Sequence, residues 1–292
     1  MSETWTPPKL VAWIKEELAR RGLDGNLRLE AELLVAQGLK IERIDIYLRH
    51  DQPLSEPERA QVRELVRRRF AREPLGYILG EAHFWTLELA VGPGVLCPRP
   101  DTETLVEALL HQAPKTGVLR AAELGLGSGA ISLAFGLERG QLEIDGVEKS
   151  PQAAAYARTN IQRYQEALIQ KNVVLNLIEA DGLGGLEGPY DLIYSNPPYI
   201  AAAEMATLEP EVRDYEPLEA LEAPEEGLAF YRHLFEQSLR LLAPGGMLAF
   251  EHGWQQKELI QTLAPPEFHL IAAIQDLTGK DRVLLYQTSG AA

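Results

Sequence analysis

The sequence predicts an α/β protein in which a mostly parallel sheet follows a small bundle of helices. Three observations support this fold class. Apolar residues in the first 75 positions recur only at helical spacing. From about residue 101 onward, strand-like runs alternate with helical segments, and such alternation implies parallel strands with helices on both faces. The last two strand-like runs have no helix between them, so they are expected to form an antiparallel hairpin.

Residues 1–75 are expected to form the helical bundle. Its first segment, "PPKLVAWIKEELARRG", opens with prolines, places apolar residues at helical spacing and stops at Gly22. "NLRLEAELLVAQGL" follows the same logic, and "SEPERAQVRELVRRRFARE" adds a capping box of Ser55 and Glu58. The last helix carries the basic run "RRRFAR" at residues 67–72. Such a run is usually a solvated helix face and less often a docking surface for an RNA-associated partner.

Residues 76–98 are expected to form a β-hairpin linker, because "HFWTLELAVGPGVLCPRP" alternates residue types around a Gly-Pro-Gly turn. Residues 99–292 are expected to form the α/β domain. Its strands are predicted near 119–124, 142–147, 173–178, 190–195, 247–252, 268–274 and 282–288. Its helices are predicted near 101–112, 129–139, 151–166, 227–242 and 254–263. The Glu- and Pro-rich stretch 200–224 is expected to form a long active-site loop.

A glycine-rich turn follows the first strand of this sheet. The segment "ELGLGSGAISLA" ends the strand at Glu123 and enters the next helix through Gly125, Leu126, Gly127, Ser128 and Gly129. Glycines there permit a tight turn and close approach of a ligand to the backbone. In a dinucleotide fingerprint the third glycine would come one residue later. The spacing instead resembles the first motif of class I S-adenosylmethionine (SAM) methyltransferases, whose ligand has no pyrophosphate.

Acidic residues follow the next two strands. Glu148 ends the second strand, where a carboxylate is placed to accept both hydroxyls of a ribose. Asp181 and Gly182 follow the third strand, where this fold usually contacts adenine. Glu148 could instead be a charge at a helix N-terminus, and Asp181 a turn residue. The glycine turn, Glu148 and Asp181 follow the first, second and third strands in that order, and this combination favours a SAM site.

The fourth strand ends in "SNPPYI", which contributes Asn196, Pro197, Pro198 and Tyr199. The two prolines lack N–H donors and prevent the chain from continuing as sheet or helix. Asn196, which precedes a proline, is held in an extended conformation. The segment is either an ordinary loop terminator or a polar clamp at the carboxyl edge of the sheet, where open α/β sheets bind their ligands.

The motifs together resemble those of amino-group methyltransferases, and they are most similar to the protein-(glutamine-N5) methyltransferases of the PrmC/HemK family. The similarity covers nearly the whole chain and includes "PRPDTETLVE", "ELGLGSGAISLA", "SNPPYI", "EVRDYEPLEAL" and "EHGWQQ". It implies a Rossmann-like class I methyltransferase domain that uses SAM. It also implies methylation of the Gly-Gly-Gln loop of class-1 peptide chain release factors, which supports translation termination. Glu123 and Glu148 stand where the family often has Asp, and Gly182 replaces a bulky residue.

The resemblance also implies roles for the clamp. A carboxamide nitrogen is a poor nucleophile because its lone pair is delocalised into the carbonyl. The Asn196 side-chain oxygen and the Pro197 carbonyl would each accept one N–H of the substrate amide, so that the lone pair points at the methyl group. The prolines fix these acceptors and Tyr199 packs over the flat amide. Arg99, Thr102 and Glu103 would form a wall of the SAM site, although Thr102 and Glu103 are equally suited to capping a helix.

Composition and charge narrow the function classes. The 292 residues carry a net charge of −15, and the positions after residue 80 hold 14 basic against 30 acidic side chains. Such an acidic body repels nucleic-acid phosphates and attracts basic partners. The N-terminus lacks a signal-peptide pattern, no stretch is apolar enough to span a membrane, and Cys97 is alone. We therefore expect a cytoplasmic monomer without metal, direct nucleic-acid contact or membrane contact.

Several alternatives remain open from the sequence. The enzyme could methylate a glutamine of a ribosomal protein, or an amino group of a nucleic acid. A SAM-binding regulatory or scaffold protein is less consistent with the intact clamp. We expect residues 1–75 to recognise the protein substrate, because the motif residues all lie beyond residue 95 and the bundle carries Arg67, Arg68, Arg69 and Arg72.

Overall fold

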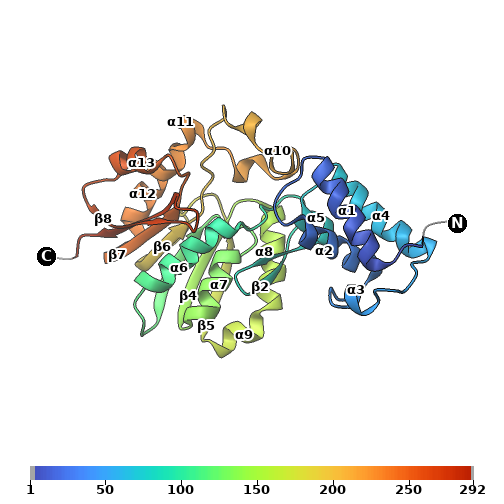
Figure 1. Ribbon diagram of the computed structural model, residues 1–292. Coiled ribbons are helices and arrows are strands. Elements are labelled where there is room, and N and C mark those ends of the chain that lie inside the picture. The colour runs from blue at the N-terminus through green and yellow to red at the C-terminus, as the bar shows by residue number, and fades with distance from the viewer. Residues whose placement is uncertain (1–3, 291–292) are drawn as a thin grey trace. The chain divides into compact units, whose positions relative to one another are not determined.

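The computed structural model describes residues 4–290, which form two compact units. Unit 1 comprises the chain up to Gly80 together with Pro210–Tyr215, and unit 2 comprises Glu81–Glu209 and the chain from Glu216 onward. Figure 1 shows the helices of unit 1 before residue 80 in blue to teal and its segment Pro210–Tyr215 in gold, and the elements of unit 2 run from teal to red. None of the described helices is long and apolar enough to cross a membrane.

Unit 1 is built from short helices around one apolar core. These are α1 (Pro7–Arg20), α2 (Leu27–Leu39), α3 (Asp45–Leu48), α4 (Glu56–Phe70) and α5 (Leu75–Leu79). Ile14, Leu34 and Ile46 are fully buried in that core. The predicted capping box is present at the start of α4, where the Ser55 backbone N–H donates to Glu58 Oε2 at 2.8 Å.

The segment α10 (Pro210–Tyr215) belongs to unit 1, although it lies within the stretch predicted to be an active-site loop. Glu211 accepts hydrogen bonds from Arg69 Nη1 at 2.9 Å and from Arg72 Nε at 2.8 Å. The Tyr215 hydroxyl donates to the Ala71 carbonyl at 2.7 Å. The helical unit is therefore discontinuous in sequence and ends at Gly80, not at residue 75.

The expectation that Arg67, Arg68, Arg69 and Arg72 all face outward is wrong. Arg69 is buried and bonds to Glu30 and Glu211, while Arg72 bonds to the same Glu211. Arg68 bonds to Glu73 and to the backbone carbonyl of Tyr77. A guanidinium carries several donors that internal carboxylates and carbonyls can satisfy, so a basic run does not have to be a basic surface. Only the Arg67 side chain, 73% exposed, points to solvent.

The sheet of unit 2 has the strand order β5-β4-β3-β6-β7-β9-β8. Its strands are β3 (Leu119–Leu124), β4 (Leu142–Glu148), β5 (Val173–Glu179), β6 (Tyr190–Ser195), β7 (Leu242–Glu251), β8 (Phe268–Gln275) and β9 (Asp281–Thr288). The pairs from β5 to β7 are parallel, and β9 runs antiparallel to both β7 and β8. The predicted mostly parallel sheet with an antiparallel last strand is confirmed.

Helices cover both faces of this sheet. On one face α6 (Glu103–Gln112) and α7 (Ala130–Arg139) pack on Ala121 and Leu192, and on the other α12 (Ala229–Leu241) and α13 (Lys257–Leu263) pack on Ala122 and Ile193. Adjacent strand residues thus enter two separate cores, because successive side chains alternate across a strand. The helix predicted near 151–166 is divided into α8 (Pro151–Arg163) and α9 (Gln165–Gln170).

The predicted hairpin is present, but its turn is not the Gly-Pro-Gly segment. Strands β1 (Glu81–Phe84) and β2 (Leu87–Ala90) pair with Phe84 opposite Leu87, so the turn is Trp85-Thr86. Trp85 has a positive φ of 57°, and its backbone N–H donates to Glu103 Oε1 at 2.7 Å. The Glu103 carboxylate, which is distant in sequence, therefore stabilises the turn. The Gly-Pro-Gly segment gave no indication of this turn position.

Candidate active site

The carboxyl ends of β3, β4, β6 and β7 meet at one edge of the sheet. The register pairs Leu124 with Val147 and with Ser195, and Ser195 with Phe250. The chain order reverses between β3 and β6. Open α/β sheets bind ligands in the crevice at such a switch point. The glycine turn, Glu148 and the Asn-Pro-Pro-Tyr segment all follow strands that end there.

The glycine turn after β3 has an open, left-handed backbone. Gly125, Gly127 and Gly129 have φ values of 77°, 59° and 84°. A Cβ added at Gly125 or Gly127 would meet no atom within 4 Å. The backbone is therefore accessible to a ligand at both positions, and a side chain at either would occupy that space.

The other two residues of this turn contribute backbone rather than side chains to the site. Leu126 is 3% exposed and its side chain lies against Gly146 of β4. Ser128 is also buried, and its carbonyl accepts from Asn160 Nδ2 at 2.9 Å.

Glu148 supports the glycine turn as well as facing the site. Its Oε2 accepts from the Gly127 backbone N–H, and its Oε1 accepts from the Ser150 backbone N–H, both at 2.8 Å. Glu148 is buried and lies at the end of β4, where the sequence placed it. Each carboxylate oxygen has a further lone pair, so these bonds leave the group able to accept from a ligand hydroxyl.

Glu123 lies beneath the turn and is fully buried. The Ser132 hydroxyl donates to its Oε2 and lies 2.7 Å from the Tyr194 hydroxyl. Burial raises the pKa of the Glu123 carboxyl to about 8, so the group is largely protonated at neutral pH. Its Oε1 has no hydrogen-bond partner among residues 4–290.

Asp181 and Gly182 lie beyond the end of β5. The Asp181 side chain is 75% exposed, and its Oδ2 forms an ion pair with Lys149 Nζ at 3.0 Å. A Cβ at Gly182 would come within 3.1 Å of the Gln237 side chain, which accepts the Leu183 backbone N–H at 2.7 Å. A bulky residue at position 182 would displace Gln237, so this side of the site offers backbone and an exposed carboxylate that is paired with Lys149.

Asn196 is oriented by a residue from a distant segment. Its Nδ2 donates to Thr102 Oγ1 at 3.0 Å. Its Oδ1 makes no hydrogen bond within the described chain, nor does the Pro197 carbonyl. Thr102 forms no capping bond to α6, so its hydroxyl is committed to Asn196 and not to the helix. The sequence left Thr102 open between wall and cap, and the structure excludes the cap.

Tyr199 is held from behind by Glu251, the last residue of β7, and by Gln256, which follows the strand. Its hydroxyl donates to Glu251 Oε1 at 3.3 Å, and its carbonyl accepts from Gln256 Nε2 at 2.9 Å. Burial raises the pKa of the Tyr199 phenol, so it stays protonated. Pro197 is buried between these anchored neighbours, and Pro198 is partly exposed.

Gly227 lets the chain pass directly behind this clamp. Its φ is 84°, and an added Cβ would overlap both the Tyr199 carbonyl oxygen and Gln256 Nε2. The residue precedes α12, which begins at Ala229 and not at 227 as the sequence predicted. A glycine is required here for two reasons, the left-handed backbone and the close approach.

We expect Gly227→Ala to slow roughly tenfold the methyl transfer that the family resemblance implies, because displacement of Tyr199 would misalign a positioned substrate. SAM affinity is expected to change little. The matched control is Gly279→Ala, which has the same positive φ of 80° but open space around it. Turnover measured with labelled SAM would separate the two, and equal losses in both variants would show backbone strain alone.

An ion pair joins two of the segments that carry the family resemblance, "PRPDTETLVE" and "EVRDYEPLEAL". Arg99 Nη2 donates to Glu216 Oε2 at 2.6 Å, and Glu216 is buried. Sequence reasoning quoted both segments but assigned Glu216 no role. It likewise missed Glu251, Gln256 and Gly227, since their partners lie dozens of residues away.

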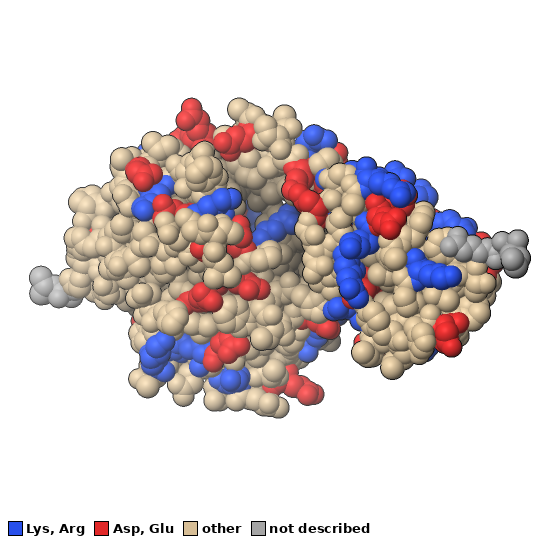
Figure 2. All heavy atoms as spheres, viewed as in Figure 1, with Lys and Arg blue, Asp and Glu red and all other residues tan. Residues whose placement is uncertain are grey.

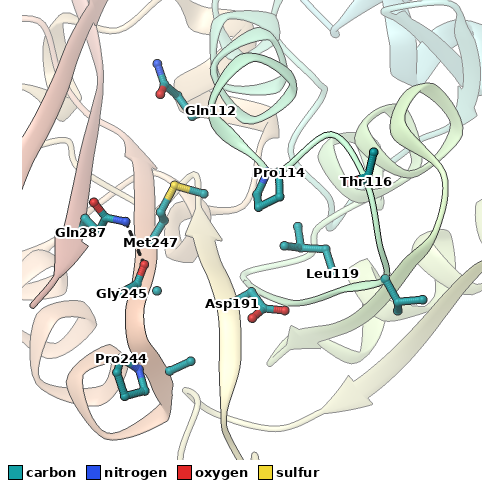
Figure 3. Close-up of a pocket in the computed structure, with 12 residues that line it drawn as sticks. Gln112, Pro114, Thr116, Leu119, Asp191, Pro244, Gly245, Met247 and Gln287 are labelled. Carbon is teal, nitrogen blue, oxygen red and sulfur yellow. Dashed lines mark hydrogen bonds between the residues drawn. The ribbon is translucent and has the colours of Figure 1, made fainter. Parts of the chain in front are cut away.

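A separate cavity of about 300 Å³ lies at the opposite edge of the sheet (Figure 3). Leu119 and Asp191, which line it, stand at the beginnings of β3 and β6. Pro114, Met247 and Gln287 also point into this space in the close-up. The cavity is thus on the amino side of the strands and is distinct from the candidate site.

The residues present at the carboxyl edge fit SAM. Glu123 offers a buried oxygen without a partner in the described chain, and Gly125 and Gly127 leave a backbone cradle that a Cβ would fill. Glu148 retains acceptor capacity for ribose hydroxyls. No group of three or more His, Cys, Asp or Glu side chains among residues 4–290 is arranged to hold a metal ion.

Family models and curated relatives both match this chain to methyltransferases. Residues 9–80 match the model of the PrmC N-terminal domain, and residues 89–209 match that of the methyltransferase small domain. The release factor glutamine methyltransferase of Geobacter sulfurreducens is 39% identical over 284 residues, covering 97% of this chain and 96% of that protein. The release factor glutamine methyltransferase of Escherichia coli is 35% identical over 275 residues, covering 94% and 96%.

Among solved structures, a methyltransferase from Pyrococcus furiosus superimposes with a TM-score of 0.52 at 21% identity. It covers 80% of this chain and 99% of its own. This likeness shows the methyltransferase fold.

Proposed function

Since the chain belongs to the family of release factor glutamine methyltransferases, we propose that it methylates the side-chain amide nitrogen (N5) of the glutamine in the Gly-Gly-Gln loop of a class-1 release factor. SAM is the methyl donor. The observation that carries the proposal is the Asn196 amide, whose nitrogen is held by Thr102 while its oxygen is left for a substrate.

The clamp addresses the main difficulty of this reaction. Delocalisation of an amide lone pair is reflected in a rotational barrier of about 18–20 kcal/mol for peptide bonds. Asn196 Oδ1 and the Pro197 carbonyl accept the two N–H groups of the glutamine amide, which fixes the nitrogen and favours its pyramidal form. Positioned acceptors act without reorganisation during the reaction, so no general base is needed before attack. Tyr199 and Pro198 close the clamp around the flat amide.

The part of the carboxyl edge that is formed by the ends of β3, β4 and β5 binds SAM, which supplies an electrophilic methyl group when bound. Glu148 accepts the ribose hydroxyls, and the Glu123 Oε1 atom, which has no partner in the described chain, is available to bond to a polar group of the cofactor. The turn itself, from Gly125 through Leu126, Gly127 and Ser128 to Gly129, contributes backbone. Asp181 and Gly182 border the adenine.

The substrate assignment is tested by incubation with labelled SAM and purified release factor, ribosomal protein or DNA. We expect label in the release factor at its Gly-Gly-Gln loop. Label in a ribosomal protein glutamine would support the sister activity, and label in DNA would overturn the proposal. The net charge of −15 disfavours a nucleic-acid substrate.

Unit 1 contacts the protein substrate in this proposal. An apolar groove of about 470 Å³ runs between α1 and α4, with Trp5, Trp13 and Phe70 among its walls and Arg63 and Arg67 on its rim. On the face drawn in Figure 2, Lys and Arg side chains gather over this unit. Deleting residues 1–80 would leave α10 without its partners Arg69 and Arg72, so surface substitutions test the role better than truncation.

We expect the double substitution Arg63→Glu and Arg67→Glu to raise KM for the whole release factor about tenfold, an effect typical of losing interfacial charge complementarity. Turnover of a short glutamine peptide should be unchanged. The control is Lys15→Glu with Lys40→Glu, an equal charge change outside the groove. Equal effects on peptide and whole protein, or equal effects of both variants, would rule out recognition by this surface.

A further inference from the structure

We propose that Arg99 binds the carboxylate in the amino-acid part of SAM, and that Glu216 is a positioning residue that orients the Arg99 guanidinium for this contact. The inference rests on the proposed function, because it assigns one further group of the cofactor to a residue of this chain. The family resemblance places Arg99 in a wall of the SAM site, but it names no group that Arg99 binds and gives Glu216 no role.

Arg99 stands at the start of the turn that holds the clamp. Its carbonyl accepts the Thr102 backbone N–H at 3.1 Å, which closes the 3₁₀ turn Pro100–Thr102. The Thr102 hydroxyl oxygen accepts in turn from Asn196 Nδ2 at 3.0 Å. Arg99 is therefore one short turn away from the residue that is proposed to hold the substrate amide.

Glu216 is connected to the other end of the clamp. The segment that follows it returns to Ile200, the residue directly after the clamp, through two backbone hydrogen bonds of 2.9 Å to Leu221 and Ala223. The ion pair of 2.6 Å between Arg99 Nη2 and Glu216 Oε2 joins this segment to the turn that holds the clamp. Each partner of the ion pair thus belongs to a segment that is hydrogen-bonded at one end of the clamp.

The two partners of this ion pair differ in exposure. The Glu216 side chain is 1% exposed, whereas the Arg99 side chain is 38% exposed. A guanidinium has five N–H donors, and of the Arg99 side-chain nitrogens only Nη2 makes a hydrogen bond within the described chain. The buried carboxylate therefore fixes one part of a planar group, and the donors on Nε and Nη1 remain for a partner from outside the chain.

Glu216 is a charged group in a place where an apolar side chain would cost less. Burial raises the pKa of its carboxyl, and the Arg99 guanidinium opposes this shift. Its Oε1 has no hydrogen-bond partner among residues 4–290. A carboxylate that is buried is costly unless it is paired, so a residue that only filled space would be apolar. The orientation of Arg99 accounts for the charge at this position.

The chemistry of SAM indicates which group Arg99 binds. In the proposed function the ribose meets Glu148 and the methyl group faces the amide held by Asn196. A short aliphatic chain connects the sulfonium to a carboxylate, so this carboxylate must lie near the clamp and away from the ribose. A guanidinium presents donors in a planar fork that matches the two oxygens of a carboxylate. Arg99 therefore has the right chemistry beside the right end of the cofactor.

Two other cations near the candidate site are already committed to carboxylates. Arg282 is buried and is shared between Asp101 and a second aspartate. Lys149 Nζ pairs with Asp181 Oδ2 at 3.0 Å on the side of the site assigned to adenine. Arg99 has one carboxylate partner and several donors left, so it is better suited than either of them to bind a further anion.

Decarboxylated SAM isolates this contact, because it keeps the adenosine, the sulfonium and the amine and lacks only the carboxylate. We expect Arg99→Ala to raise the Kd of SAM about tenfold or more, the effect of losing a hydrogen bond between charged groups. The Kd of decarboxylated SAM should stay within about twofold, because that ligand has no carboxylate for Arg99 to bind. Calorimetric titrations measure both values, and an unchanged second value also shows that the variant is folded.

Glu216→Gln tests the positioning role and preserves the shape of the side chain. We expect it to raise the Kd of SAM by a smaller factor, about threefold, because the amide oxygen still accepts from Arg99 but carries no charge. The Kd of decarboxylated SAM should again be unchanged, whereas a purely structural role would change both values. In the Arg99→Ala background, Glu216→Gln should have no further effect on the Kd of SAM.

Arg99→Lys provides a conservative variant that carries the same comparison if the alanine variant does not fold. Lysine keeps the positive charge but lacks the planar fork, so it cannot bond to Glu216 and to a ligand carboxylate in the same way. Its Kd for SAM should lie between those of the wild type and of Arg99→Ala. Its Kd for decarboxylated SAM should equal that of the wild type.

Arg120→Ala is the matched control for these titrations. The Arg120 side chain is likewise 38% exposed and pairs with a carboxylate, that of Asp145, at 3.8 Å. It lies near the start of β3, at the end of the strand opposite to the candidate site. Both Kd values should therefore equal those of the wild type.

The outcomes separate the inference from the proposed function. An unchanged Kd of SAM in Arg99→Ala, or equal losses for SAM and decarboxylated SAM, would overturn the inference. A higher KM for the release factor with an unchanged Kd of SAM would also overturn it, and would assign Arg99 to the protein substrate. Failure of the wild-type chain to bind SAM would instead overturn the proposed cofactor.

Discussion

Asn196→Ala is expected to lower the rate of methyl transfer by about 10²–10³-fold, the usual effect of removing one preorganised acceptor. The Kd of SAM should stay within a few-fold, because Asn196 bonds to Thr102 and not to the glycine turn. Thr102 Oγ1 would lose the hydrogen bond from Asn196 Nδ2. Single-turnover rates with purified release factor, together with calorimetric SAM binding, measure the two effects separately.

Gln255→Ala provides the control, because it removes an exposed amide from the same loop that follows β7. It should leave both turnover and SAM binding unchanged. Asn196→Asp adds a second comparison: it retains an accepting oxygen but loses the donor to Thr102, so its loss should be smaller than that of the alanine variant. Near-wild-type turnover of Asn196→Ala at saturating substrate would contradict the proposed role.

The sequence predicted the sheet well because its signals are local. The run of Leu192, Ile193 and Tyr194 followed by two prolines marks both the interior and the end of β6. Glycines with positive φ after Glu123 likewise mark the turn into α7. The end of β6 and the turn into α7 are each determined by residues within a few positions of them. The strands of the parallel sheet could therefore be located from such local patterns.

What the sequence could not reveal depends on partners far along the chain. Asn196 and Thr102 are 94 positions apart, and Arg69 and Glu211 are 142 apart. Nothing local distinguishes a guanidinium that will be buried against a carboxylate from one that will face solvent. The same holds for Gly227, whose need for glycine arises from the Tyr199 carbonyl that folding brings against it.

Glu148→Ala is expected to weaken SAM binding tenfold or more, because a charge-assisted hydrogen bond contributes about 1.5–3 kcal/mol. The structure adds a second reason for this loss. Glu148 also accepts the backbone N–H groups of Gly127 and Ser150, so its removal frees the glycine turn that cradles the ligand. The free energy of SAM binding, measured by calorimetry, should therefore change more than the turnover at saturating SAM.

Glu179→Ala is the matched control for this prediction, because Glu179 ends β5 directly opposite Glu148 in the strand register. Its side chain is 49% exposed and pairs with Arg158, and among the described residues it makes no hydrogen bond to the glycine turn. Both variants remove a glutamate from the end of a parallel strand, but only one removes the proposed ribose acceptor. Glu179→Ala should bind SAM within about twofold of wild type, since exposed ion pairs contribute little. Unchanged SAM affinity in Glu148→Ala, or equal weakening in both variants, would contradict the ribose assignment and leave Glu148 with its support of the turn alone.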